Sequence, residues 1–362
     1  MLEILPKVSD IEPAEECRGV LLRLLREAEE FPLFKHLSVG QHLRRAPLLE
    51  VFIAAFFDAV AEIVRGGLLR QYQEHEEDLQ VVRGCIVASR QFAIHSNRPD
   101  RIACRFDDLT ASNIWNQLIK TGLQAVRPWV RSVELNRRWI ELMAVFDEVD
   151  DTQVKVRELK RLVFNRHAMR YRVVSDWVRW ILSLQSPDLR AGQNDAPGLL
   201  FDMNLLFQSA IASVLRRRAG AIHNLQVRSQ DSGSYLASVA GSHTHRAFAL
   251  RPDLVMYKSG QVAAIGDTKW KRVEVSKTGY LKPTPADIYQ MHAYATKYQC
   301  GDLALIYPWH EGLSGSKVTT FELPPIGEIR PRVDILCVDV HSDSLDLRSC
   351  GGSRAGFAAL FT

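Results

Sequence analysis

The chain has 362 residues, 46% of them hydrophobic and 24% charged, which is typical of a globular protein with two or three domains. Its formal net charge of +4 permits an anionic partner such as nucleic acid but does not require one. The six cysteines are scattered without a C-x-x-C pair, which argues against a zinc site or a disulfide framework and predicts a cytoplasmic protein. The most apolar stretch, Leu48 to Val64, contains three acidic residues and is too short to span a bilayer, so no membrane partner is expected.

The first third of the chain mixes two hydrophobic periods. Four elements are expected here: helices over 13–33 and 41–65, and strands over Leu79–Ala88 and Arg101–Phe106. Asp107 to Thr110 is predicted to open a further helix, with Thr110 or Ser112 as its cap, that continues to Leu123. Residues 1–125 are therefore predicted to form an α+β N-terminal domain.

The middle of the chain reads as helical. From Pro128 to about Leu184 the pattern favours helices, and Ser186–Gly198 is rich in turn-forming residues. We therefore predict a helical linker region over residues 126–198.

The last part of the chain alternates between helices and strands. The expected elements are a helix from Phe201 to Arg218, a strand near Leu225–Arg228, a hairpin over 248–273, a helix from Pro285 to Tyr298, and strands near Leu303–Pro308, Lys317–Leu323 and Val333–Val340. Residues 229–247, between the first of these strands and the hairpin, are expected to form a loop. This order predicts an α/β domain with a mixed central sheet over residues 199–362.

Charged side chains interrupt the apolar hairpin between Arg251 and Lys271. Asp253 starts its first strand, and the triplet from Asp267 to Lys269 closes its second strand. Because side chains alternate along a strand, Asp267 and Lys269 share one face and Thr268 points away. Charged groups on an otherwise buried hairpin are costly unless they bind something, so this stretch is the best indication of function.

The turn of this hairpin decides whether the two acids can act together. A three-residue loop, Ser259–Gln261, pairs Asp253 directly across from Asp267. A two-residue turn, Ser259–Gly260, puts the acids on opposite faces unless a bulge corrects the register. A functional site therefore predicts a longer loop or a bulge.

Two neighbouring carboxylates raise each other's pKa unless a cation lies between them. Oxygen ligands suit magnesium, and Lys269 could orient or activate an attacking water, which together favour phosphodiester hydrolysis. Gln290 and Tyr294 share a face of the following helix and could hold a scissile phosphate or a DNA strand. The alternatives are that such short motifs occur by chance and that the helix residues are core packing beside a surface glutamine.

These residues resemble a known family. Arg251-Pro-Asp, thirteen residues, and Asp267-Thr-Lys together resemble the PD-(D/E)xK nuclease signature. The surroundings resemble the McrC family, the nuclease subunit of the 5-methylcytosine-specific McrBC restriction system. The segments that carry this resemblance are Ile4-Leu-Pro-Lys, Leu79 to Gly84, Phe106 to Thr110, Asn116, Phe201 to Gln208, Asp267-Thr-Lys-Trp-Lys, Asp287 to Ala295 and Leu305-Ile-Tyr-Pro.

The resemblance implies a site and a reaction. Residues 199–362 would be a PD-(D/E)xK nuclease domain that cuts double-stranded DNA with Mg²⁺, which Mn²⁺ can replace. Asp253 and Asp267 would bind the metal, and Lys269 would complete the catalytic set. The implied supporting or DNA-binding residues are Gln208, Lys271, Gln290 and Tyr294.

The resemblance also implies a partner. The N-terminal domain would dock on a hexameric AAA+ GTPase, McrB, and stimulate its GTP hydrolysis. McrB would recognise the modified cytosine, and the restriction system as a whole would serve in phage defence. This chain has no G-x-x-x-x-G-K-[S/T] of its own, in keeping with a nucleotide bound by the partner.

The chain departs from the family at two places, and two other functions remain as alternatives. Many relatives carry Glu where this chain has Gln208, so Gln208 is interpreted as a supporting residue. In relatives Ile4-Leu-Pro-Lys often follows further β-strands, so the expectation is that the N-terminus is either truncated or mis-called. The alternatives are a stand-alone RecB-like nuclease, suggested by Gln290-x-x-x-Tyr294, and a non-catalytic subunit that only activates the GTPase.

Overall fold

The computed structural model divides the chain into two compact units. It describes residues 5, 13–28, 32–34, 46–98, 100–152, 154, 163–184, 199, 201–222, 224–230, 234–240, 246–317, 319–342, 344–347 and 356–361. The first unit comprises Met1–Ala46 and Leu200–Thr362, and the second comprises Pro47–Leu199. The boundary between Leu199 and Leu200 lies one residue from the expected one at 198/199. No boundary falls at 125/126, and residues 1–46 join the C-terminal unit because the first helix of the chain packs there. The expected linker over 186–198 lies outside the described residues.

The first unit is built on a six-stranded mixed sheet with the strand order β12-β13-β11-β8-β7-β4. Its strands are β4 (Leu225–Ser229), β7 (Leu254–Lys258), β8 (Gln261–Thr268), β11 (Asp302–Pro308), β12 (Thr320–Glu322) and β13 (Arg332–Val338). Strand β11 runs parallel to both β8 and β13, and the other neighbours are antiparallel. The predicted mixed sheet is confirmed, and each of these strands overlaps an expected one.

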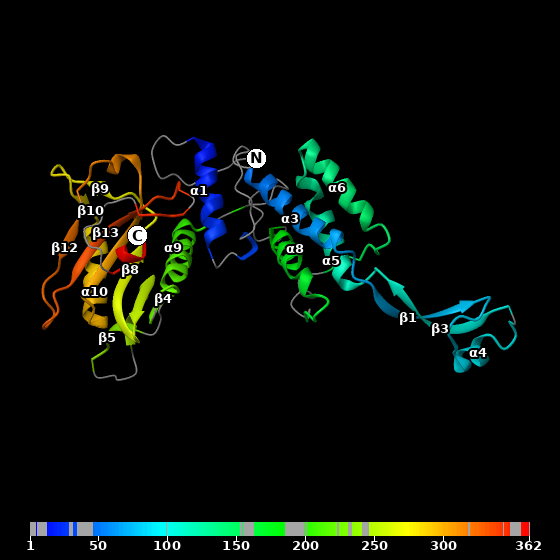
Figure 1. The fold of residues 1–362 in the computed structure, drawn as a ribbon. Helices are drawn as coiled ribbons and strands as arrows, with labels where there is room; N and C mark the ends of the chain where they lie inside the picture. Colours follow the sequence, from blue (N-terminus) through cyan, green and yellow to red (C-terminus); the bar gives the residue numbers. More distant parts are fainter. Residues whose placement is uncertain are drawn as a thin grey trace. The chain divides into compact units, whose positions relative to one another are not determined.

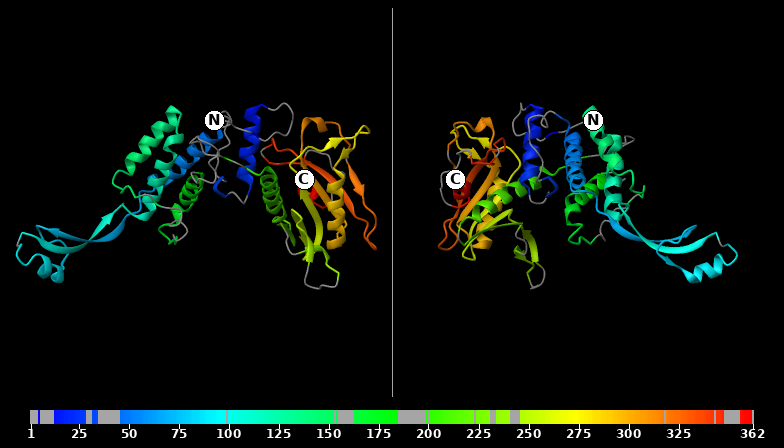
Figure 2. Two further views of the ribbon diagram at one scale, coloured as in Figure 1. Left: turned by 180° about the vertical axis from the view of Figure 1, so that it is seen from behind. Right: turned by 45° about the vertical axis from the view of Figure 1, so that its right-hand side comes forward.

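Helices lie on both faces of this sheet, with α9 (Met203–Ala219) and α10 (Pro285–Tyr298) on opposite sides (Figures 1 and 2). Helix α10 buries Met291, Tyr294 and Ala295 in one core with the strands. Its first turn is fixed by a capping box between Thr284 and Asp287. Helix α1 (Ala14–Glu27) packs against α9, as does the short α11 (Ala358–Phe361).

Two small ribbons extend from the first unit. β5 (Ser234–Ser238) pairs with β6 (Arg246–Leu250), and β9 (Glu274–Val275) pairs with β10 (Leu281–Lys282). The segment expected to be a loop before residue 248 therefore contains most of a two-stranded ribbon. Two short 3₁₀ turns, η1 (Pro32–Phe34) and η5 (Glu311–Leu313), complete the described part of this unit.

The second unit combines a helical core with a β ribbon. Its elements are α3 (Leu48–Arg65), β1 (Gln71–Leu79), β2 (Cys85–Ile86), α4 (Ala88–Ile94), β3 (Ile102–Thr110), α5 (Ile114–Val126), η2 (Arg127–Trp129), α6 (Val133–Val145), η3 (Met169–Tyr171) and α8 (Arg172–Leu184). Helix α5 approaches α8 and α3 closely at Gly122, where an added Cβ would lie 2.6 Å from Val178 Cγ2 and 3.0 Å from Phe56 Cζ. Among the described helices, none is long and apolar enough to cross a bilayer.

Buried asparagines anchor the ribbon to this core. Asn113 and Asn116 both donate from Nδ2 to the Leu69 carbonyl, at 2.6 and 2.9 Å. Tyr171 donates from its hydroxyl to Asn116 Oδ1 at 2.8 Å, and the same hydroxyl accepts from the Leu69 amide. The chain entering β1 is thus tied to α5 and η3 by a satisfied buried network.

Several predictions for this unit are wrong. The strand expected over Leu79–Ala88 is instead the end of β1, the short β2 and the first residue of α4. Residues Asp107–Thr110 belong to β3, and α5 is capped by Asn113, whose side chain accepts from the amides of the second and third residues after it. Residues Asp107–Thr110 carry no buried side chain, so the end of β3 lacks the apolar alternation that marks a half-buried strand. In the first unit, α1 also ends at Glu27, earlier than the helix expected to reach residue 33.

Candidate active site

The β7–β8 hairpin places Asp253 and Asp267 on the same face. Its turn has two residues, Ser259 and Gly260, both with positive φ (51° and 82°), as a type I′ turn requires. A bulge between Met256 and Tyr257 shifts the register, so that Leu254 lies opposite Gly266. The same register brings Asp253 opposite Asp267. The bulge predicted for a two-residue turn is confirmed, and the alternative of a three-residue loop is wrong.

Thr268, which lies between Asp267 and Lys269 in the chain, holds Asp253 in place. Thr268 donates to Asp253 Oδ2 from its backbone amide and from its hydroxyl, each at 2.7 Å. The expectation that Thr268 points away from the site therefore needs correction, because its hydroxyl reaches across to the neighbouring strand. With both donors on Oδ2, the other carboxylate oxygen of Asp253 accepts no hydrogen bond from the described residues.

Asp267, Lys269 and Gln290 form a closed triangle of contacts. Lys269 Nζ lies 2.6 Å from Asp267 Oδ2 and donates to Gln290 Oε1 at 3.0 Å. Gln290 Nε2 in turn donates to Asp267 Oδ1 at 3.0 Å. Among the described residues, the Lys269 ammonium is the one close polar contact of the buried Asp267 Oδ2. A metal ion at this oxygen would share it with Lys269 or take the place of the ammonium.

Both carboxyl groups are harder to ionise than usual. Burial, reinforced by the charge of Asp253, raises the pKa of Asp267 from 3.8 to about 6, although Lys269 opposes the rise. Burial likewise raises the pKa of Asp253, and the two hydrogen bonds from Thr268 only partly offset this. Asp267 is 1% exposed, so its charge has almost no help from water. The ionised forms of both acids are therefore unfavourable in this fold, and such perturbed carboxyl groups are common at functional sites.

Gln290 and Tyr294 extend the network away from the two acids. Gln290 Nε2 also donates to the Tyr294 hydroxyl at 2.8 Å, and this hydroxyl donates to the Arg251 carbonyl at 3.1 Å. Burial raises the pKa of Tyr294, so the phenol stays protonated and keeps this bond. The two N–H groups of the Gln290 amide are thereby used on Asp267 and Tyr294, which leaves none for the phosphate contact expected from the sequence.

Lys271, two residues after Lys269, is paired with Asp287. Its Nζ lies 3.0 and 2.7 Å from the two oxygens of Asp287 and 3.3 Å from Thr284 Oγ1. Asp287 also accepts from the Tyr307 hydroxyl at 3.1 Å. Burial opposes ionisation of Asp287, but its hydrogen bonds from Lys271, Thr284 and Tyr307 outweigh it and lower the pKa of this carboxyl.

Gln208 is not part of this hydrogen-bonded cluster. It is half-buried on α9, the helix on the opposite face from α10, and makes no hydrogen bond to Asp253, Asp267 or Lys269. The neighbouring Phe207 packs against Trp270, with ring centroids 5.3 Å apart. The structure thus brings together Asp253, Asp267, Lys269, Gln290 and Tyr294 and leaves Gln208 outside their network.

The donor set fits a hard divalent cation held by few protein ligands. The described residues contain no cluster of three or more His, Cys, Asp or Glu that could hold a metal by themselves. The site instead offers two facing carboxylates, each with an oxygen that accepts no hydrogen bond from the described residues. Magnesium is commonly bound through one or two carboxylates, with water and substrate phosphate as its other ligands.

Thr268, Asp287 and Tyr307 have structural roles at the site that sequence reasoning missed. A signal existed for Asp287, because a Thr followed three residues later by an acid is a capping-box pattern at the start of a helix. No local pattern indicated Tyr307, since its contact with Asp287 depends on how β11 lies beside α10.

Comparisons with known proteins add the family. The model of the family "McrBC 5-methylcytosine restriction system component" matches residues 1–308. The chain is similar to a chain of a refined half-complex from a tetradecameric assembly of Thermococcus gammatolerans McrB AAA+ hexamers with bound McrC. That match has a TM-score of 0.69 and 18% identity, and covers 99% of this chain and 78% of that chain. A second match, to the cryo-EM structure of the Thermococcus gammatolerans McrBC complex, has a TM-score of 0.45 and 23% identity over 60% of this chain and 62% of that chain. A search of curated proteins found no match.

Proposed function

This chain belongs to the McrBC 5-methylcytosine restriction system component family, and from that premise we propose that it is the McrC-type nuclease subunit of a modification-dependent restriction system. The observation that carries the proposal is the convergence of Asp253, Asp267 and Lys269 on one face of the β7–β8 hairpin. A purely structural hairpin has no need for two facing acids whose pKa values are both raised, one of them fully buried and raised further by the charge of the other. We propose that residues 199–362 form a PD-(D/E)xK nuclease domain around them.

Asp253 and Asp267 would hold magnesium, or manganese in its place, through the carboxylate oxygens that have no hydrogen bond from the described residues. When bound, the ion would supply Lewis-acid polarisation of the phosphate and a more acidic water. Thr268 keeps Asp253 turned toward the site, and Gln290 does the same for Asp267. Their role is to hold the acids in a geometry ready for the ion.

Lys269 acts on the reacting groups. Its ammonium is fixed between Asp267 and Gln290, so it reaches the substrate without a large loss of side-chain freedom. From this position it orients the attacking water and offsets the negative charge that grows on the phosphate in the transition state. The products are a hydroxyl and a phosphate monoester end, and the chain forms no covalent intermediate.

We propose that the partner is a hexameric AAA+ GTPase of the McrB type, and that this chain stimulates its GTP hydrolysis. The related half-complex is described as McrB AAA+ hexamers with bound McrC. In the present chain the surface that suits such a partner is the β1–β3 ribbon with α4, which exposes large apolar side chains. The exposed side chains of this ribbon and α4 form a larger set than single surface residues would, namely Tyr72, Val81, Val82, Ile86, Phe92, Ile94 and Leu109, and such sets mark interaction sites.

Cleavage of a plasmid tests this function. The full chain is mixed with its GTPase partner, Mg²⁺, GTP and a plasmid that carries 5-methylcytosine, and the same mixture without each component serves as control. We expect linear product only in the complete mixture, and we expect Asp267→Asn to stop cleavage while stimulation of GTP hydrolysis continues. Cleavage by the Asp267→Asn variant would refute the assignment of the site. Magnesium-dependent nicking without partner or GTP would instead establish the stand-alone nuclease.

A further inference from the structure

The segment between Lys271 and Thr284 leaves the site and returns to it. It follows directly on Lys269 and Trp270, forms the β9–β10 ribbon, and ends at the cap of α10, the helix that carries Gln290. Val273 and Leu281, at the two ends of the ribbon, are buried in the core of the first unit. The ribbon is therefore fixed at its base, and the polar side chains around it have defined positions relative to the two acids.

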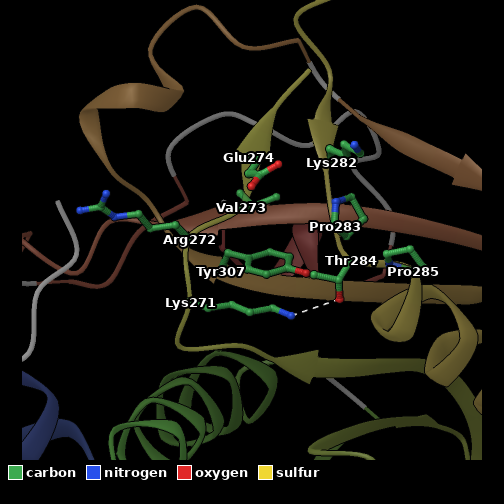
Figure 3. A pocket seen from close by; sticks show the side chains of 9 residues that line it. All are labelled: Lys271, Arg272, Val273, Glu274, Lys282, Pro283, Thr284, Pro285 and Tyr307. Atoms are coloured by element: carbon green, nitrogen blue, oxygen red, sulfur yellow. Dashed lines mark hydrogen bonds between the residues drawn. The ribbon is translucent and has the colours of Figure 1, made fainter. Parts of the chain in front are cut away.

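A pocket of about 210 Å³ lies at the base of this ribbon (Figure 3). Its lining includes the cations Lys271, Arg272 and Lys282, one acid, Glu274, and the ring of Tyr307. In Figure 3 the Tyr307 ring lies between Lys271 on one side and Glu274 and Lys282 on the other. The pocket is smaller than the roughly 300–1,000 Å³ of sites for drug-sized molecules, which suits a phosphodiester group more than a whole nucleotide base.

The two lysines of the pocket are not equivalent. Lys271 is held by the Asp287 carboxylate at 2.7 Å, so its charge is largely balanced within the protein. Lys282 is exposed and forms no ion pair with any acidic side chain among the described residues. Lys282 is therefore a mobile cation at the rim of the pocket, while Lys271 and Thr284 form a rigid wall.

We propose that this pocket binds a phosphate of the cleaved DNA strand beside the scissile phosphate, with Lys282 as its cationic ligand. The inference rests on the proposed nuclease function and adds a binding subsite to it. Continuity carries it, because the chain runs from Lys269 at the acids to the pocket wall at Lys271 within two residues. A DNA strand whose scissile phosphate lies at Asp253 and Asp267 can therefore place a neighbouring phosphate at the pocket. Lys271 acts here by positioning, since its pairing with Asp287 fixes the wall against which the phosphate lies.

A charge-deletion experiment tests the subsite. DNA binding is measured in the Asp267→Asn background of the full chain with its partner, at salt concentrations from about 50 to 200 mM. Raising the salt over this range weakens DNA binding by a certain factor. If Lys282 contacts one phosphate, that factor should be about 3.5-fold smaller for Lys282→Ala than for the protein that keeps Lys282. Glu274→Gln should have the opposite effect on affinity and tighten binding, because Glu274 is the only acid among the described residues that line the pocket.

The matched control is Lys297→Ala. Lys297 is an exposed lysine of α10, about 18 Å along the helix axis from Pro285 at the pocket. It should leave both the affinity and its salt dependence unchanged. Equal effects of Lys282→Ala and Lys297→Ala would overturn the proposal, because they would show a diffuse charge effect and no subsite.

A second measurement locates the phosphate. Cleavage is followed on duplexes in which one phosphate at a time near the cut is replaced by a neutral methylphosphonate. We expect one flanking position at which the wild-type enzyme slows several-fold and Lys282→Ala slows no further, as for two halves of one contact. Independent effects of the two changes at every flanking position would overturn the subsite while cleavage itself upheld the nuclease. Absence of cleavage from every duplex, including the unmodified one, would overturn the proposed function and the subsite together.

Discussion

Replacing Asp267 by asparagine should remove activity and stabilise the protein without metal. Raising the pKa of this buried carboxyl from 3.8 to about 6 corresponds to about 3 kcal/mol against its ionised form at neutral pH. Asparagine removes that charge and can still accept from Gln290 at Oδ1. It also loses the ion pair with Lys269 and turns an N–H toward the ammonium. We therefore expect a net gain of about 1–3 kcal/mol in the free energy of unfolding.

The pH dependence of this gain has a definite sign. A carboxyl whose pKa is raised in the folded state stabilises the fold below its unfolded pKa of 3.8, and this contribution is lost as the pH rises through about 6. The wild type should thus fall increasingly behind Asp267→Asn from about pH 4 to pH 6, and the difference should level off above about pH 7. Denaturant unfolding in EDTA across this range measures it.

Asp287→Asn is the matched control for this experiment. Asp287 is also buried in the same unit, but its pKa is lowered, with Lys271, Thr284 and Tyr307 favouring the ionised form. Its replacement should destabilise the protein at neutral pH. Magnesium should then raise the stability of the wild type and leave Asp267→Asn unchanged. An Asp267→Asn protein that is less stable than the wild type at neutral pH in EDTA would refute the reasoning.

Three further changes should have distinct effects. At low magnesium, the cleavage rate should fall about tenfold per pH unit below about pH 6, because protonated Asp267 cannot bind the ion. Cleavage rates measured against pH at two magnesium concentrations check this. The midpoint of the rate profile should move to lower pH at the higher magnesium concentration. Gln290→Ala should lower kcat by about 10–100-fold, since it frees Asp267 and Lys269, while Tyr289→Ala on the exposed face of α10 should retain full activity in the same assay. Gly122→Val should destabilise the second unit by at least about 1–3 kcal/mol, because its side chain would overlap Val178, and calorimetry should show the transition that responds to magnesium unchanged.

Much of the first unit could be predicted because its elements are buried and locally coded. Helix α10 spans the predicted residues, since Pro285 follows a capping threonine and the apolar face repeats at helical spacing. Strand β11 is a continuous apolar run, as expected for a strand covered on both faces. The candidate acids were also found, because charge on an apolar hairpin is conspicuous in sequence.

Other features depend on contacts that no local pattern encodes. The bulge before Tyr257 sets the pairing of the two acids, yet it could be stated only as one of two alternatives. Strand β1 was missed because nearly all its side chains are polar and none is fully buried, so it lacks an apolar face in the sequence. The packing of α1 on α9 joins residues far apart in the chain and places the N-terminal helix in the C-terminal unit.

The most direct test of the proposed site measures two activities of one assembled complex. Asp253→Asn and Lys269→Met are each combined with the GTPase partner, and both GTP hydrolysis and cleavage of methylated plasmid are followed in magnesium. We predict that the variants stimulate GTP hydrolysis as the wild type does and produce no cut DNA, because they alter only the chemistry at the β7–β8 hairpin. Cleavage at the wild-type rate by either variant would contradict the proposed site.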